Sequence, residues 1–407
     1  MSRESRQIIM PYSIVILLAY IGFSLPLPLL PEMFLDATHS VVIPKMDMKY
    51  KIILLGLIMA SFPLGQFFGS PLLGHLSDRF GRKKVVIFSL AGAALGYCLT
   101  ALSVLAPSVK LMAFGLALCG FCEGNVTIAQ SVIADLTAGE GRHQEKARHF
   151  GRINFFIALG FVIGPFMGGY LADPAIVSWF NFSTPFWVAG ILSLIVIGII
   201  YRFSQETLVR EEETEKWSLF KTMWVGFKDP NLKIYYFANF FLAFGYFSFF
   251  RFLPVFLERV FDFDARELAY VMVYNSLMIG VGIAILIPFL SKRWKPVRSL
   301  SIFSWLLSIA FVICLLPNVP LALLATIPPI GFCLAVAITY GALLISDRAP
   351  KAFQGQALGT LTSVQVLAGT LTAIVGGVLA SIDIEWPLYL GAAMTTLCGF
   401  LLIKEWK

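Results

Sequence analysis

Two ionisable side chains lie inside long apolar stretches of this 407-residue chain, where an isolated charge is costly. Glu123 is at the centre of the stretch 110–136, about 20 Å from either end at the helical rise of ~1.5 Å per residue. A central acid costs about 3 kcal/mol on membrane-insertion scales, so it requires a cavity, a partner or a proton. Glu123 shares one helical face with Thr127 and Gln130. We interpret it as a proton or cation carrier, and the alternative is a structural acid held by hydrogen bonds.

Arg251 is the second such side chain, about 10 Å inside the outer end of the stretch 233–258 at the same helical rise. A guanidinium at this depth can bind a substrate carboxylate or phosphate, or close a gate with Glu32 or Glu258. An arginine near the end of a span can also extend its head group to the membrane surface and have no further role. The sequence leaves all three interpretations open.

Long apolar runs form the framework that must position these two residues. The composition is 58% hydrophobic and 14% charged, with a mean hydropathy of +0.81. A span takes about 20 apolar residues, and its backbone must satisfy its own hydrogen bonds in lipid, so the runs predict an all-α membrane protein. We expect twelve transmembrane helices, at 8–34, 52–75, 84–106, 110–136, 150–172, 184–203, 233–258, 267–290, 297–316, 320–346, 354–380 and 386–403.

The basic residues predict the orientation in the membrane. The two ends of the chain and alternate connections hold 24 of the 31 Lys and Arg residues, which places both termini and a central linker in the cytoplasm. The same bias explains the net charge of +7, so no nucleic-acid partner is expected. Cys119 and Cys122 have metal or redox spacing, but no His is nearby, and we expect neither a metal nor a cofactor. We also expect no enzymatic activity, because no His, Ser or Asp cluster lies near the membrane surface and the four histidines lie at the end of an apolar run or outside the runs.

The chain repeats itself with an offset near 212 residues. Asp135, at the end of the fourth run, recurs as Asp347 at the end of the tenth. The repeat predicts two pseudo-symmetric six-helix bundles, at 1–203 and 231–407. Residues 204–230 between them form a predicted cytoplasmic linker, in which aromatic residues recur at helical spacing from Trp217 to Phe227. This pattern predicts an amphipathic helix on the membrane surface.

A glycine, an acid and a basic cluster lie in the connection between the second and third runs. We interpret Gly74 as a site of close helix packing, and Asp78 as a charge partner of Arg82 and of a helix N-terminus. The alternative is that the basic residues only set the topology. The residues of this predicted latch are Gly74, Asp78, Arg79, Gly81 and Arg82, followed by Lys83 and Lys84.

Small residues recur in the fifth run. Gly160, Gly164 and Gly168 are spaced every four residues, which predicts one smooth face for close helix contact, while Pro165 permits a bend. Ordinary small-residue packing would explain this face equally well.

Both motifs resemble signatures of the major facilitator superfamily. The connection after the second run matches the superfamily signature G-x-L-x-D-R-x-G-R-K-K at every defined position. The fifth run resembles the antiporter motif of drug and metabolite exporters, and residues 133–151 resemble tetracycline-type exporters. The resemblance covers essentially the whole chain, and it implies that the Asp78 cluster latches the cytoplasmic ends of the two halves in the outward-open state. The residues of the antiporter motif are Gly151, Gly160, Gly164, Pro165, Gly168 and Gly169.

Two positions depart from the family pattern. Leu116 stands where many proton-driven exporters have an arginine in the fourth span, and Ala19 stands where tetracycline exporters have an acid in the first. Glu123 is the candidate replacement for this proton machinery, and the coupling ion is left open.

The resemblance and the residues together predict a proton-coupled exporter that works by alternating access around a midplane site. We expect a monomer in the bacterial inner membrane, in contact with lipid and protons, that exports a drug or an endogenous metabolite such as a siderophore. The alternatives are an importer of an organic anion that uses Arg251, and a non-transporting receptor or scaffold. The candidate substrate-binding residues, each of which could instead form an ordinary interhelical hydrogen bond, are Tyr20, Gln66, Thr127, Gln130, Asn154, Asn239, Tyr246, Arg251, Tyr274, Asn275, Tyr340 and Gln365.

Overall fold

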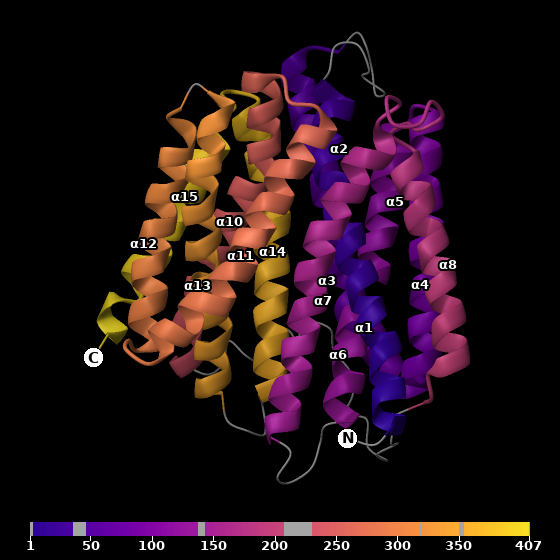
Figure 1. Cartoon of the computed structure of the whole chain (residues 1–407), viewed down its shortest axis with the longest axis vertical. Helices are drawn as coiled ribbons and strands as arrows, with labels where there is room; N and C mark the ends of the chain where they lie inside the picture. Colours follow the sequence, from indigo (N-terminus) through magenta and orange to yellow (C-terminus); the bar gives the residue numbers. More distant parts are fainter. Residues whose placement is uncertain are drawn as a thin grey trace. The chain divides into compact units, whose positions relative to one another are not determined.

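The computed structural model describes residues 3–35, 46–136, 143–206, 230–317, 319–349 and 354–406. The regular structure in these ranges is helical (Figure 1). Twelve spans in them are long and apolar enough to cross a membrane, which confirms the predicted all-α class. The cytoplasmic location of the termini stays a prediction, and the surface helix predicted from Trp217 to Phe227 lies outside the described residues.

The helix bounds lie close to the predicted spans. The helices of the first half are α1 (Arg3–Ser24), α2 (Pro26–Leu35), α3 (Met48–Phe80), α4 (Arg82–Leu105), α5 (Val109–Cys122), α6 (Asn125–Leu136), α7 (His143–Ala172) and α8 (Thr184–Phe203). Those of the second half are α10 (Pro230–Phe261), α11 (Ala265–Ser291), α12 (Pro296–Leu315), η2 (Pro320–Ala322), α13 (Leu323–Arg348), α14 (Gln354–Ala380), α15 (Trp386–Leu401) and η4 (Ile403–Glu405).

Capping side chains fix where two of these helices begin. The Ser108 hydroxyl accepts a hydrogen bond from the Leu111 N–H at 3.3 Å and starts α5. Asp264 and Glu267 form a reciprocal capping box at the start of α11, with N···O distances of 2.7 and 3.1 Å. Each contact satisfies backbone N–H groups that have no partner within the helix itself.

Two predicted spans are interrupted. The first predicted span, 8–34, divides at Leu25 into α1 and α2, because Pro26 has no backbone N–H with which to continue the hydrogen bonds of α1. The span predicted over 110–136 contains a break, since α5 ends at Cys122 and α6 begins at Asn125. Glu123 and Gly124 form the turn between them, so the helical periodicity that placed Glu123, Thr127 and Gln130 on one face does not run unbroken through Glu123.

The chain forms two compact units, Met1–Pro44 with Ser61–Trp217, and Lys45–Ala60 with Ser218–Lys407. Helix α3 contributes to both units, because its first part belongs to the second unit. There Gly56 lies against α14, and a Cβ at Gly56 would be 2.6 Å from the Gly377 Cα. Only a residue without a side chain fits such a close backbone approach.

The core of the first unit is built where α1, α4, α6 and α8 meet. Tyr12, Ile16, Val86, Ile128 and Ile200 are buried together in this cluster. Helix α4 is central, because it packs along both α5 and α8. This arrangement places the middle of α4 beside the end of α5, where Glu123 lies.

The core of the second unit is organised around α10, which packs along α14 and α15. Phe249 of α10 stacks on Phe311 of α12 with ring centroids 3.9 Å apart. The Ser248 hydroxyl donates to the Pro387 carbonyl at 2.6 Å and ties α10 to α15. These contacts hold α10, and with it Arg251, in a fixed place within the unit.

Candidate functional site

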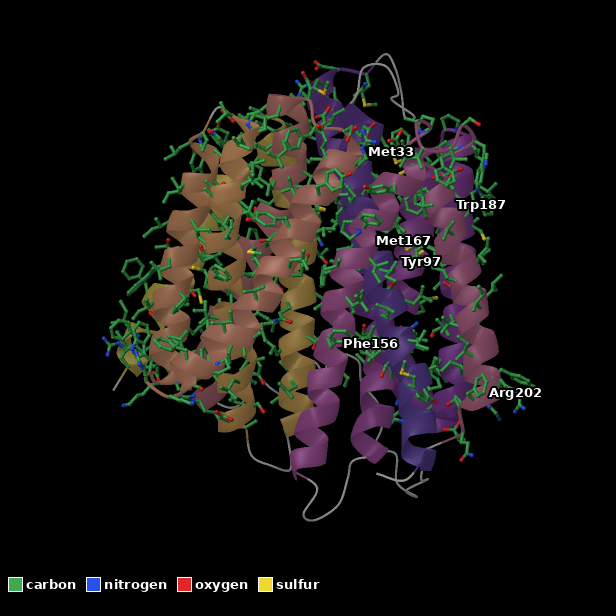
Figure 2. The ribbon with its side chains drawn as sticks, viewed as in Figure 1. Met33, Tyr97, Phe156, Met167, Trp187 and Arg202 are labelled. Atoms are coloured by element: carbon green, nitrogen blue, oxygen red, sulfur yellow. The ribbon has the colours of Figure 1, made fainter. Side chains whose placement is uncertain are left out.

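Glu123 is buried at the junction of α5 and α6, with 4% of its surface exposed. The Tyr97 hydroxyl of α4 donates a hydrogen bond to Glu123 Oε1 at 3.1 Å. Figure 2 shows Tyr97 between Met33 and Arg202, which lie toward opposite ends of the first unit. No cation in the described part of the chain pairs with this carboxyl group. Because an unpaired carboxylate is costly to bury, the site favours a carboxyl group that takes up a proton or meets a cationic group.

Gly22 of α1 closes the other side of the carboxyl group. A Cβ at this position would collide with the Tyr97 hydroxyl and lie 2.9 Å from Glu123 Oε1. Three helices, α1, α4 and α5, therefore meet at the Tyr97–Glu123 hydrogen bond. We did not predict Tyr97 or Gly22 from the sequence, and the available signal was a lone tyrosine in the middle of the third apolar run.

Asn125 opens α6 two positions after Glu123, and only 2% of its surface is exposed. Its Oδ1 atom has no hydrogen-bond partner among the described residues. A buried acceptor without a donor is unfavourable unless water or a ligand supplies the donor. We did not predict Asn125 from the sequence, although it follows Glu123-Gly124 directly in a span that is otherwise rich in apolar residues.

Arg251 is buried in the second unit, with 3% of its surface exposed. Its Nη1 group donates to the Gly369 carbonyl of α14, and the guanidinium carbon lies 5.3 Å from the centre of the Phe247 ring. It forms no ion pair with a described carboxylate of its own unit, so the predicted pairing with Glu258 is absent. The pairing with Glu32 stays a prediction. The burial also argues against a head group extended into water at the membrane surface.

Some predicted substrate-binding residues instead connect helices. The Asn239 amide donates to the Tyr235 and Gly341 carbonyls at 2.9 and 3.1 Å and joins α10 to α13. The Tyr274 hydroxyl donates to the Leu324 carbonyl at 3.0 Å and joins α11 to α13. These contacts favour the alternative of ordinary interhelical hydrogen bonds for Asn239 and Tyr274.

Other predicted binding residues remain candidates. Asn275 Oδ1 and the Tyr340 hydroxyl are buried without a hydrogen-bond partner in the described part of the chain. Tyr20 packs against Phe161 with ring centroids 5.4 Å apart. The side chains of Gln130 and Asn154 lie outside the described residues. The half-buried members of the predicted set are Tyr20, Gln66, Thr127, Tyr246, Tyr274 and Gln365.

The hinge between α3 and α4 turns at Gly81, whose φ of 106° favours glycine. Asp78 Oδ1 and Arg82 Nη1 are 2.9 Å apart, so the predicted ion pair within the hinge is formed. Among the described residues, a Cβ at Gly74 would meet no heavy atom within 4 Å, so the close packing that we predicted at Gly74 stays a prediction. The predicted contact of Asp78 with a helix N-terminus stays a prediction.

Glu206, just beyond the end of α8, binds the start of α4. Its carboxylate accepts hydrogen bonds from the backbone N–H groups of Arg82 at 2.8 Å and Lys83 at 3.3 Å. In return, Lys83 Nζ donates to the Tyr201 and Ser204 carbonyls at 2.9 and 2.7 Å. An anion at a helix N-terminus and a cation at a helix C-terminus both complement the helix dipoles. Glu206 lies in the predicted linker 204–230, and the sequence did not predict this role.

Replacing Glu206 by alanine is expected to lower the melting temperature of the purified protein by a few degrees. The loss of a charged helix cap costs about 1 kcal/mol. Asp347→Ala is the matched control, because Asp347 is exposed and has no recorded polar contact in the described part of the chain. Equal melting temperatures for Glu206→Ala and Asp347→Ala would contradict the capping role.

The predicted glycine face of α7 is confirmed as a close helix contact. A Cβ at Gly160 would lie 2.6 Å from the Tyr20 Cβ, one at Gly164 would collide with the Ser24 hydroxyl, and one at Gly168 would lie 2.5 Å from the Leu25 carbonyl oxygen. The Ser24 hydroxyl also donates to the Gly160 carbonyl at 3.1 Å. Pro165 and Gly169 are buried in the same helix, and Gly151 lies nearer its start.

Comparison with known proteins assigns the fold to a family. The family model of the Major Facilitator Superfamily matches residues 12–305 and 284–405. Among solved structures, the human organic anion transporter MFSD10 has a TM-score of 0.72 at 20% identity, with coverage of 98% of this chain and 100% of that one. A D-xylose-proton symporter has a TM-score of 0.72 at 16% identity, with coverage of 98% of both chains.

Several curated relatives are drug resistance proteins. The chain is 34% identical to the class C tetracycline resistance protein of Escherichia coli over 173 residues, which cover 42% of this chain and 38% of that protein. The matches to the class B and class H proteins cover 52% and 44% of those proteins, so the chain matches about half of their length. Multidrug resistance protein 2 of Bacillus subtilis is 24% identical over 96% of this chain and 93% of that protein.

Proposed function

Because this chain belongs to the major facilitator superfamily and is a multi-pass membrane transport protein for small molecules, we propose that it exports an organic molecule in exchange for protons. The proposed location is the bacterial inner membrane. The proposed working parts are two six-helix halves, 1–203 and 231–407, which alternate access to a central site while the linker 204–230 connects them.

The observation that carries the proton coupling is the environment of Glu123. The carboxyl group is 4% exposed, and its one hydrogen bond from a described side chain comes from Tyr97. A buried carboxyl group with no cation beside it gains most from binding a proton. Uptake and release of that proton would tie the protonation of Glu123 to the conformational cycle.

Two observations support export. The glycine face of α7 makes the close contact with α1 that the antiporter motif would require. The relatives that the chain matches over nearly their whole length include multidrug resistance protein 2 of Bacillus subtilis and the quinolone resistance protein NorA of Staphylococcus aureus, each covered to 93%. Their bacterial origin also supports the inner membrane as the location.

The hinge supplies a second test of alternating access. Replacing Asp78 by asparagine removes the ion pair with Arg82 and the proposed latch between the halves. Such a contact is worth about 1–3 kcal/mol, enough to shift a two-state equilibrium by roughly tenfold or more. We expect a larger inward-open population and slower turnover without unfolding. Spectroscopic labels on the cytoplasmic ends of the halves report the distance, and an unchanged distance distribution would leave the basic hinge as a topology signal only.

The experiment that tests the proposed function begins with a thermal-stability screen of small molecules on the purified protein. A molecule that stabilises the protein is then followed in proteoliposomes with an imposed pH gradient. Accumulation against its concentration gradient, reversed when the pH gradient is reversed, supports proton-coupled exchange. Flux that equilibrates the molecule at every pH gradient contradicts the coupling.

A further inference from the structure

We propose that the guanidinium of Arg251 binds an acidic group, such as a carboxylate, of the exported molecule. This inference rests on the proposed export function and names the chemical class of its substrate. Arg251 belongs to the second unit, and Glu123 belongs to the first.

The first support is a buried charge without a counter-charge. Arg251 is 3% exposed, and none of the described carboxylates of its unit pairs with it. A guanidinium carries five N–H donors. One protein acceptor, the Gly369 carbonyl, is recorded for them in the described residues. Donors and charge left unmatched in a buried place are unfavourable until an anion or water meets them.

The second support is the shape of the surroundings. Phe247 lies against the guanidinium, and Gly369 faces both groups from α14. A Cβ at Gly369 would lie 3.3 Å from the Phe247 ring and 3.5 Å from Arg251 Nη2. Because Gly369 has no side chain, its carbonyl can accept the hydrogen bond from Arg251 without displacing the Phe247 ring. Since one edge of the guanidinium is oriented by the carbonyl, the remaining N–H groups are held ready for a planar oxyanion.

The position along α10 also favours binding over a surface role. Arg251 is ten residues before the end of α10 at Phe261, which is about 15 Å at the helical rise of ~1.5 Å per residue. Glu258 is two turns nearer to that end, and Arg251 does not pair with it. A positive charge this far inside a span is a functional feature by default in membrane proteins.

The test uses purified full-length protein and three acid–amide pairs: 2-naphthoate, indole-3-acetate and salicylate, each with its neutral amide. Melting temperature and tryptophan fluorescence report binding. We expect at least one acid to bind the parent more tightly than its amide does. The Arg251→Gln substitution should lower the affinity for that acid by roughly thirtyfold and change the affinity for the amide by less than about twofold. The affinity of Arg251→Lys for the acid should lie between those of the parent and Arg251→Gln, because an ammonium group keeps the charge but lacks the planar, forked N–H groups of a guanidinium.

Arg266→Gln is the matched control for the loss of a positive charge, because Arg266 lies in the first turn of α11 and its side chain is 38% exposed. If Arg251→Gln does not fold, Gly369→Ala replaces it, with Gly359→Ala as its control, because a Cβ at Gly359 meets nothing within 4 Å. Gly369→Ala should lower the affinity for the acid several-fold, and Gly359→Ala should leave that affinity unchanged. The proposal is overturned if no acid is preferred over its amide, or if the acid binds the Arg251 variants or Gly369→Ala as tightly as the parent.

The outcome can be separated from that of the proposed function. Acid binding that depends on Arg251 in a protein without proton-driven flux would support the anion site and contradict proton-coupled export. Proton-driven flux of a neutral or cationic molecule, with no acid preference, would support export and overturn the role of Arg251.

Discussion

Glu123→Gln is expected to abolish the pH-driven accumulation of substrate while binding and exchange of substrate persist. Glutamine has nearly the same shape as glutamate but cannot take up or release a proton, so the transport cycle would no longer depend on the gradient. For an exchange of one proton, a gradient of one pH unit drives up to about tenfold accumulation. In proteoliposomes the parent should approach this ratio, and the Glu123→Gln protein should only equalise the substrate concentrations on the two sides.

Tyr97→Phe is the matched control for this substitution. It removes the hydrogen bond to Glu123 Oε1 but keeps the carboxyl group and the aromatic ring. We expect slower flux that remains coupled to the gradient. If Glu123→Gln accumulates substrate as the parent does, the proton is carried elsewhere and the interpretation of Glu123 is wrong.

Gly164→Val is expected to have the largest effect on folding. A Cβ at Gly164 would collide with the Ser24 hydroxyl and lie 2.6 Å from the Ile21 carbonyl oxygen, so α7 and α1 must separate to accept it. Overpacking of this kind costs about 1–3 kcal/mol, and more where backbone atoms are in the way. We expect a strong loss of folded protein in the membrane, measured by fluorescence-detected size-exclusion chromatography of detergent extracts, and a lower melting temperature of what remains.

Gly198→Val is the control, because Gly198 lies in α8 of the same unit and a Cβ there would meet nothing within 4 Å. Its yield and melting temperature should stay near those of the parent. Similar losses for the two variants would mean that valine is poorly tolerated in these spans in general, and would remove the argument for a specific α7–α1 contact.

The spans could be predicted from the sequence because the thickness of the membrane sets a length that apolar runs display directly. The runs predicted at 184–203 and 354–380 coincide with α8 (Thr184–Phe203) and α14 (Gln354–Ala380). The four-residue spacing of Gly160, Gly164 and Gly168 likewise predicted a contact that the structure contains. The pattern that predicts each of these features lies within the residues of one helix.

The surroundings of the candidate site could not be predicted in the same way. At the break after Glu123, Gly124 lies close to Ser70, which is far from it in the chain, and a Cβ at Gly124 would be 2.8 Å from the Ser70 Cα. The roles of Tyr97 and Glu206 depend on partners 26 and 124 residues away. A sequence pattern displays local periodicity, but these contacts arise only when particular helices pack side by side.

Proton release by the purified protein on substrate binding shows whether Glu123 carries the coupling proton. In weakly buffered detergent solution with a pH indicator dye, addition of a substrate from the stability screen should release protons from the parent in a fixed ratio to the substrate bound. Glu123→Gln should bind the same substrate and release none. Proton release by Glu123→Gln equal to that of the parent would show that another group carries the proton.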